Sequence, residues 1–203
     1  MAELLILGAG GHGRVVADAA LASGAWSRVF ACDRNPARAS GELLPGVALL
    51  AIDSTLTQSC TLHVAIGRAA NRETETAAAT GRQHVTVIHP HASVSVHASV
   101  AAGCFIAAQA VVAPGAVLGR AVIVNHGAVV DHDVVVGEFS HVAPGAVLGG
   151  GVRVGRRVLV GAGSTVLPGI GIADDVTIGA GAVVTQPIAE AGVYAGVPAR
   201  RLK

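Results

Sequence analysis

The sequence predicts two parts, an α/β region over residues 1–85 and a parallel β-solenoid over residues 86–203. Three observations support this division. A glycine-rich segment near the start follows a short apolar run, and from Ile88 onward an aliphatic residue recurs at every sixth position. Aromatic residues make up only 2% of the chain while glycine occurs 27 times, so the core must consist of small aliphatic side chains in thin, repeated layers.

The first element of the α/β region is predicted from residues 4–20, LLILGAGGHGRVVADAA, which are typical of a buried strand, a glycine turn and a helix. Gly8, Gly10 and Gly13 have the G-x-G-x-x-G spacing in that context, where free N–H groups at a helix N-terminus attract phosphate. His12 lies inside the turn, where an imidazole can meet a phosphate or a sugar. The alternative is that the glycines serve only a tight turn.

Two further strands complete the predicted Rossmann-like region. The segment RVFACD ends at Asp33, at the distance where a carboxylate can bond a ribose hydroxyl. The segment LHVAIG ends at Gly67 and is followed by a helical stretch that carries Asn71 and Arg72. This region is too short for both halves of a dinucleotide-binding domain, so a single nucleotide is the expected ligand.

The solenoid is predicted from aliphatic residues that stand six apart without an insertion. They are Ile88, Val94, Val100, Ile106, Val112, Leu118, Val124, Val130, Val136, Val142, Leu148, Val154, Val160, Val166, Ile172, Ile178 and Val184. A period of six fits short strands joined by regular turns. Three hexapeptides make one triangular coil, so these repeats predict nearly six coils that rise by about 4.8 Å each.

Composition excludes several classes of protein. The formal net charge is +1 and no lysine–arginine cluster lies beside aromatic residues, so a nucleic-acid partner is not expected. No apolar run approaches the roughly 20 residues of a membrane span, and the start lacks the basic region of a signal peptide, so we expect a soluble, cytoplasmic protein. Three widely spaced cysteines without a CxxC pair predict neither a disulfide framework nor a zinc site, and no histidine pair has compact metal-ligand spacing.

Polar residues are concentrated in one part of the repeat, residues 124–150. Asn125 and Asp131 stand where glycine or alanine is usual, and such departures from a local rule tend to occur at functional sites. His126 and His141 belong to the same stretch. We expect His126 to be a surface residue.

His132 is the strongest candidate for a catalytic base, because Asp131 and Asp133 flank it. Histidine has an ordinary pKa near neutral pH, and an adjacent carboxylate sets its tautomer and stabilises the imidazolium. Gly150 lies one predicted coil beyond His132, where a bare backbone N–H can hold a developing oxyanion. This set suits the transfer of an acyl group from a thioester to an amine or hydroxyl.

The repeat, with its closing segment GVYAGVPARR, resembles the hexapeptide-repeat acyltransferases, whose left-handed parallel β-helices assemble as trimers. With GAGGHGRVV and VAIGRAANR, the whole chain resembles bacterial acetyltransferases of nucleotide-linked 4-amino sugars and related sialic-acid O-acetyltransferases. The resemblance implies acetyl-CoA as co-substrate, a UDP- or GDP-linked amino sugar and a role in surface glycan synthesis. Arg34 follows Asp33 where some relatives carry a second acid, so guanine stays open beside uracil. O-acetylation of a sialic-acid-type sugar and non-catalytic binding of a nucleotide sugar are the alternatives.

The resemblance also implies roles for individual residues. His132 is the base, Asp133 or Asp131 orients it, and Gly150 holds the oxyanion. Acetyl-CoA is expected at His141, Gly150, Ala162 and Ala180. The nucleotide sugar is expected at Gly10, His12, Gly13, Asp33, Gly67, Arg72 and Asn125.

Assembly as a homotrimer is predicted on physical grounds as well. Flat outer faces that carry Val129, Val135 and Ala143 expose apolar surface that a lone chain rarely tolerates. Closed threefold packing buries such faces and places each acetyl-CoA channel between neighbouring chains.

Overall fold

The computed structural model describes residues 2–54 and 59–202. The N-terminal region holds a five-stranded sheet of order β3-β4-β2-β1-β5, in which only the β3–β4 pair is antiparallel. Its strands are β1 (Leu4–Leu7), β2 (Val29–Cys32), β3 (Glu42–Leu44), β4 (Val47–Leu49) and β5 (Thr61–Val64). Its helices are α1 (Gly11–Ser23), the 3₁₀ helix η1 (Pro36–Arg38) and α3 (Ala69–Ala78).

Both faces of this sheet are covered, as a parallel sheet requires. Successive side chains of β1 point to opposite faces. Leu4 and Ile6 therefore pack into a cluster with α1, whereas Leu5 and Leu7 pack on the other face. The cluster on the α1 face continues into the second half of the chain through Phe105, so the two parts share a core.

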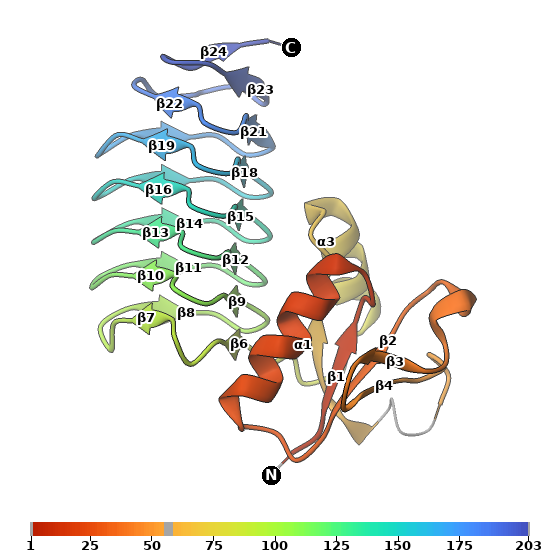
Figure 1. Ribbon diagram of the computed structural model, residues 1–203. Coiled ribbons are helices and arrows are strands. Elements are labelled where there is room, and N and C mark those ends of the chain that lie inside the picture. Colours follow the sequence, from red (N-terminus) through yellow and green to blue (C-terminus); the bar gives the residue numbers. More distant parts are fainter. Residues whose placement is uncertain (1, 55–58, 203) are drawn as a thin grey trace.

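The solenoid begins at β6, and three sheets form its sides (Figure 1); their strands pair in parallel except for the last pair, β23–β24, which is antiparallel. Sheet 1 contains β6 (Val87–Ile88), β9 (Phe105–Ile106), β12 (Ile123–Val124), β15 (His141–Val142), β18 (Leu159–Val160), β21 (Val176–Ile178), β23 (Gly192–Ala195) and β24 (Arg200–Arg201). Sheet 2 contains β7 (Ser93–Val94), β10 (Val111–Val112), β13 (Val129–Val130), β16 (Val147–Leu148), β19 (Thr165–Val166) and β22 (Val183–Val184). Sheet 3 contains β8 (Ser99–Val100), β11 (Val117–Leu118), β14 (Val135–Val136), β17 (Arg153–Val154) and β20 (Gly171–Ile172).

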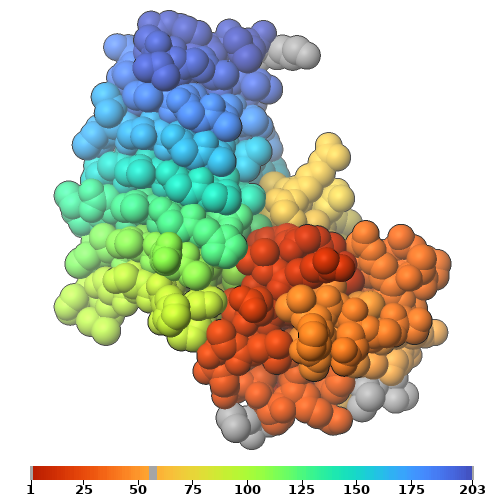
Figure 2. All heavy atoms as spheres, viewed as in Figure 1, coloured from red at the N-terminus to blue at the C-terminus, as the bar shows by residue number. Residues whose placement is uncertain are grey.

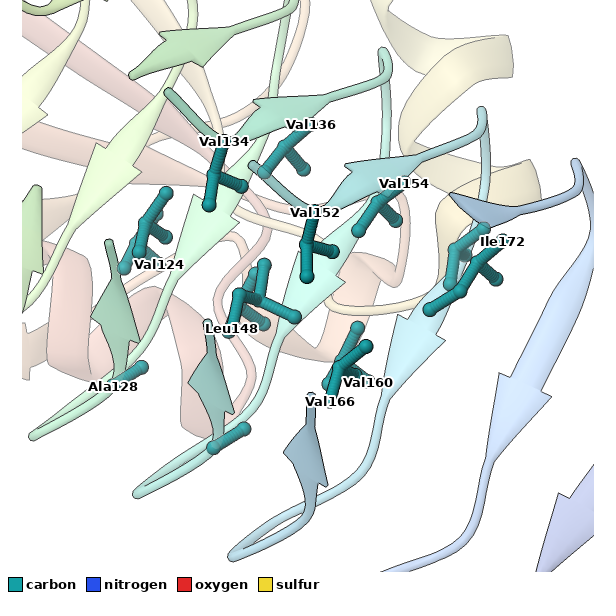
Figure 3. Packing of buried hydrophobic residues seen from close by; sticks show 14 of the residues in the cluster. Val124, Ala128, Val134, Val136, Leu148, Val152, Val154, Val160, Val166 and Ile172 are labelled. Atoms are coloured by element: carbon teal, nitrogen blue, oxygen red, sulfur yellow. The ribbon is translucent and has the colours of Figure 1, made fainter. Parts of the chain in front are cut away.

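The pairing register confirms the predicted coil of 18 residues. Val111 pairs with Val129, and Val129 pairs with Val147. The aliphatic residues at every sixth position fill the interior, as Figure 3 shows for Val124, Val136 and Leu148 among others. Each layer of the core therefore repeats the one before it.

The stacking is incomplete at the two ends of the solenoid. Ile88 in the first coil is 37% exposed, because no coil lies beneath it. At the other end Ile178 pairs with Tyr194, so the last coil is two residues shorter than the others. The six-residue period ends there.

The turns explain the abundance of glycine. A positive φ angle recurs at every sixth residue from 103 to 181, and glycine, which adopts this conformation without strain, occupies most of these positions. Asp133 is one of the exceptions, with φ of 59°. Aspartate tolerates the left-handed region better than most residues. The left-handed position of this turn thus carries the carboxylate of Asp133 next to His132.

The N-terminal region docks on sheet 1. Phe105 and Ile123, whose side chains point outward from this sheet, are buried beneath α1 and its neighbours. Figure 2 shows the N-terminal residues packed against the earlier coils, while the last coils extend beyond them. In a three-sided coil, the turns between sheets 2 and 3 lie at the corner opposite sheet 1. Over residues 2–54 and 59–202, no helix has the length and apolar character needed to cross a membrane.

Candidate active site

The turn between β13 and β14 holds the predicted base. Nδ1 of His132 donates to Oδ2 of Asp133 at 2.9 Å. The backbone N–H of His132 donates to Oδ1 of Asp131 at 2.7 Å. The sequence left either aspartate open as the residue that orients the ring, and in this structure Asp133 makes that contact while Asp131 holds the turn.

The charges around this turn favour the protonated form of the His132 imidazole. The hydrogen bond to Asp133, followed by the charge of Asp131, raises the pKa of His132 above its ordinary value. The His132 side chain is 62% exposed, so substrates can reach Nε2 from solvent. Nε2 is left for proton transfer because Nδ1 is engaged.

Gly150 lies in the corresponding turn of the next coil, against the same ring. A Cβ built on Gly150 would lie 2.5 Å from Nε2 of His132, so any side chain at this position would displace the imidazole ring. The amide N–H of Gly150 takes part in no backbone–backbone hydrogen bond among the described residues. It is therefore available as a donor beside the reactive nitrogen.

His141 lies on sheet 1, under the N-terminal region, and Asn125 holds it. The side-chain amide of Asn125 donates to Nε2 of His141 at 3.1 Å, so Nδ1 carries the ring proton. Burial, followed by the charge of Arg72, lowers the pKa of His141 to about 4. His141 is therefore a neutral imidazole near neutral pH.

The N-terminal region contains a cavity of about 600 Å³ at the carboxyl end of its strands. It is lined by Leu7, Gly8, Gly10, Gly11, His12, Asp33, Arg34, Arg38, Ala65, Ile66, Gly67, Asn71, Thr74 and Glu75. The N-terminus of α1 points its free N–H groups at this space, as a phosphate site requires. A Cβ on Gly10 would meet only Nη1 of Arg38, at 3.7 Å, so the glycine leaves room in the cavity and is not required by packing.

Asp33 is held in place at the cavity wall. Oδ2 accepts from the amide of Ala9 at 2.8 Å and Oδ1 from the amide of Asn35 at 2.9 Å. Arg38 reaches Oδ2 at 3.3 Å. Burial acts to raise the pKa of Asp33, but these hydrogen bonds lower it overall, so the carboxylate is ionised and oriented.

His12 joins the cavity to sheet 1. Its ring lies edge-on to Phe105 with centroids 5.4 Å apart, and 6.4 Å from the ring of His141. Its Nε2 is buried and has no hydrogen-bond partner in the described structure. Burial, followed by the charges of His63 and His141, lowers the pKa of His12 to about 3. A neutral imidazole therefore lies between the cavity and the solenoid.

The predicted substrate residues divide into two sets. Gly10, His12, Asp33 and Gly67 line the cavity, whereas Gly13, Arg72 and Asn125 do not. The structure gives each of these three a position outside the cavity lining. A Cβ on Gly13 would lie 1.9 Å from the carbonyl oxygen of Gly8, so this glycine serves the close packing of α1 on β1. Arg72 is buried with 1% of its surface exposed, and Asn125 holds His141 and the following turn.

Several lining residues were missed by the sequence reasoning. Thr74 and Glu75 share a face of α3 with Asn71, at the i+3 and i+4 positions, so helical spacing could have found them. Glu75 pairs with Arg34 through two nitrogens of the guanidinium, with contacts of 2.8–3.2 Å. Arg38 lies on η1, and no motif in the sequence predicted that it lines the cavity.

The predicted catalytic residues are not assembled with the cavity in one chain. His132, Asp133 and Gly150 lie at the corner between sheets 2 and 3, while His141 and the cavity lie on the side of sheet 1. The two groups are separated by the body of the solenoid.

Ala162 and Ala180 occupy a different corner, between sheets 1 and 2. Both are exposed, and the amide of Gly181 donates to the carbonyl of Ala162 at 2.8 Å, so the two alanines stack. Across the described part of the chain, no three His, Cys, Asp or Glu side chains are arranged to hold a metal ion.

Comparison with known proteins is consistent with both parts of the fold. The PglD N-terminal domain model matches residues 3–77, the bacterial transferase hexapeptide model (six repeats) residues 133–168, and the hexapeptide repeat of succinyl-transferase residues 151–186. The acetyltransferase domain of PglB from Neisseria gonorrhoeae is 36% identical, with 100% of each chain covered and a TM-score of 0.92. The chain belongs to this acetyltransferase family.

Other structures similar to this acetyltransferase contain ligands. The same PglB domain in complex with acetyl coenzyme A is 37% identical, with 98% of each chain covered and a TM-score of 0.90. A variant of perosamine N-acetyltransferase from Caulobacter crescentus, in complex with CoA and GDP-perosamine, is 34% identical; 100% of this chain and 98% of that chain are covered, with a TM-score of 0.90. A comparison with curated protein sequences gave no match. The predicted family and the predicted two-part fold are confirmed.

Proposed function

We propose that this protein transfers the acetyl group of acetyl-CoA to the amino group of a nucleotide-linked 4-amino sugar, for surface glycan synthesis. The observation that carries the proposal is the ring of His132, with Nδ1 bonded to Asp133 and Nε2 beside Gly150. Support comes from similar structures that hold acetyl-CoA or GDP-perosamine. We place the reaction in the cytoplasm, where acetyl-CoA is available.

In the proposed reaction, Nε2 of His132 takes a proton from the sugar amine as the amine nitrogen attacks the thioester carbonyl carbon. Asp133 stabilises the imidazolium that forms. The N–H of Gly150 donates to the carbonyl oxygen as it becomes an oxyanion, a contribution of about 2.7–4 kcal/mol where such a donor has been removed. Collapse of the adduct breaks the carbon–sulfur bond, and the CoA thiolate accepts the proton that His132 took from the amine.

We assign nucleotide binding to residues 1–85 and acetyl transfer to residues 86–203. The diphosphate fits at the N-terminus of α1, at Gly10 and His12, with Arg38 as an adjacent cation. The ribose fits beside Asp33, whose oxygens have lone pairs left for a hydroxyl. The base then lies toward the Arg34–Glu75 pair, which offers both donors and acceptors, so UDP and GDP derivatives both belong in the test.

The assembly we propose is a homotrimer in which the site is shared between chains. A substrate in the cavity on the sheet 1 side cannot reach His132 of its own chain at the opposite corner, so it must meet His132 of a neighbouring copy. Sheet 2 presents outward valines, Val111, Val129 and Val147, that are only half-buried in the single chain. Packing of such faces around a threefold axis buries apolar surface. The exposed stack of Ala162 and Ala180 then lines the acetyl-CoA channel.

The decisive experiment incubates the protein with acetyl-CoA and a panel of UDP- and GDP-linked amino sugars. Release of CoA thiol reports turnover, and NMR of the product shows which atom is acetylated. An N-acetylated sugar is expected. Acetylation at oxygen would support the sialic-acid-type alternative, and tight binding of a nucleotide sugar without thiol release would support a non-catalytic role.

Sharing of the site is tested by mixing two impaired variants, His132→Ala and Asp33→Ala, at a nucleotide-sugar concentration far below the KM of Asp33→Ala, where each variant alone turns over slowly. Mixed trimers contain cavities with an intact Asp33 beside a neighbouring chain with an intact His132, so activity should return after the subunits are exchanged. Light scattering should give a mass of three chains. A fully active monomer, or no recovery in verified mixed trimers, would contradict the shared site.

A further inference from the structure

Arg72, on α3, is the largest fully buried side chain among the described residues, with 1% of its surface exposed. Its five N–H groups donate to five backbone carbonyls, those of Ile66, Gly67, Ala121, Phe139 and Ser140. The contacts include 2.7 Å to Ile66, 2.8 Å to Gly67 and 2.9 Å to Ala121. The hydrogen-bonding capacity of the guanidinium is therefore fully used by the chain itself.

This cation has no carboxylate partner among the described residues. Burial lowers the pKa of Arg72 to about 10, so the group stays charged near neutral pH. A buried charge without a counter-ion is costly unless its hydrogen bonds are complete. An apolar side chain would avoid the cost of burying a charge. The presence of arginine at position 72 is therefore explained by a need for its charged, planar guanidinium.

The five carbonyls come from both parts of the protein. Ile66 and Gly67 form part of the wall of the N-terminal cavity. Ala121 and Phe139 lie in corresponding turns of successive solenoid coils, and Ser140 directly precedes His141. One rigid guanidinium thus connects the cavity wall to two layers of the solenoid.

We infer that Arg72 is a positioning residue that sets the cavity wall relative to the solenoid, so that the amino sugar reaches the acetyl group in the reactive geometry. The inference rests on the proposed function, because it assumes a nucleotide sugar that is held in the cavity of one chain while its amine meets the acetyl group beside His132 of a neighbouring chain. Arg72 touches no substrate and acts through the carbonyls it holds. Only arginine can do so, because lysine lacks the planar fork of five donors.

The substitution Arg72→Met keeps the length and removes the donors. Misplacement by about 1 Å can cost about 10²-fold in rate, so we expect a loss of that size in kcat for the nucleotide-linked sugar. The KM for acetyl-CoA and the rate of acetyl transfer to a small amine without a nucleotide should stay unchanged, because neither depends on the cavity. Arg72→Lys should lose most of the same activity although it keeps the charge.

The matched control is Glu73→Gln, at the neighbouring position of α3. Glu73 also links the two parts, through contacts of 3.1 Å to Arg156 and 3.6 Å to Arg157, but the side chains of these ion pairs remain 28–45% exposed to solvent. Ion pairs that solvent can reach contribute little to stability. Glu73→Gln should therefore retain wild-type rates with every acceptor.

The outcomes separate positioning from simple structural support. The inference would be overturned if Arg72→Met lowered the rate with the nucleotide sugar, the rate with the small amine and the affinity for acetyl-CoA by the same factor. An unchanged rate of transfer to the nucleotide sugar would also overturn it. If Arg72→Met does not fold, Arg72→Lys decides by the same criteria. If the wild-type protein acetylates no nucleotide sugar, the proposed function fails, and small-angle X-ray scattering then tests the role of Arg72 by itself. A changed scattering profile in Arg72→Lys would support positioning of the two parts. An unchanged profile would overturn it.

Discussion

His132 and Gly150 occupy corresponding turns of successive coils, with the imidazole standing directly against the glycine. A Cβ on Gly150 would lie 2.5 Å from Nε2 and 2.6 Å from Cε1 of His132. The absence of a side chain at Gly150 therefore gives the ring its place and brings a backbone N–H next to the nitrogen that takes the proton.

Gly150→Ala should lower kcat by about 10²-fold or more, because the methyl group displaces the ring of His132 and disturbs the oxyanion donor. Gly171→Ala is the control, since a Cβ there meets nothing within 4 Å. Thiol release under saturating substrates measures the effect. Equal rates in the two variants would show that the ring has room to move without loss.

His132→Ala should lower kcat by about 10²–10⁴-fold, the usual cost of losing a general base. Binding of acetyl-CoA and nucleotide sugar, measured by calorimetry, should persist because the ring is exposed and supports no core packing. His97→Ala, an exposed histidine of the first coil, should retain full activity. Near-normal turnover by His132→Ala would move the base to another residue.

The pH dependence of kcat/KM should follow the neutral form of His132. The hydrogen bond to Asp133 and the charge of Asp131 stabilise the protonated form and raise the pKa. The rate should therefore rise with pH and level off at a pH above that of an ordinary histidine. Asp133→Asn should shift the acid limb to lower pH and reduce the plateau. An acid limb unmoved by Asp133→Asn would exclude this contact as the cause.

His12→Ala and Asp33→Ala should raise the KM for the nucleotide sugar and spare the KM for acetyl-CoA. Both side chains line the N-terminal cavity, and contacts remote from the reacting atoms contribute mainly to binding. Steady-state kinetics with each substrate varied in turn gives the two constants. Weaker binding of acetyl-CoA alone would show that the cavity serves another ligand.

The protein should lose stability in mild acid. Burial lowers the pKa of His12 to about 3, and that of His63 and His141 to about 4. The unfolded chain binds protons near pH 6.5 whereas the folded chain does not, so the free energy of unfolding falls as pH drops from 6.5 toward 4.

Each of these imidazoles can contribute up to about 1.4 kcal/mol per pH unit in that window. Urea unfolding at several pH values measures the slope, and His12→Gln should make it shallower by removing one titrating group. A free energy of unfolding that is constant from pH 7 to pH 5 would contradict the buried, neutral state of these rings.

The solenoid followed from the sequence almost completely, since Val111, Val129 and Val147 repeat the same pairing one coil apart and each layer copies its neighbour. The choice of Asp133 over Asp131 did not follow, because both flank His132. It was decided by the left-handed backbone of Asp133, which turns its carboxylate toward the ring.

The site itself depended on how the two parts dock. Position after Gly67 predicted that Arg72 meets the substrate. The carbonyls that hold its guanidinium include those of Ala121 and Phe139, 49 and 67 residues away, and no local pattern predicted them. The six-residue period can be recognised in each short segment of the solenoid sequence. Contacts over such separations depend on the surface that α3 meets on the solenoid, and only the folded structure brings those groups together.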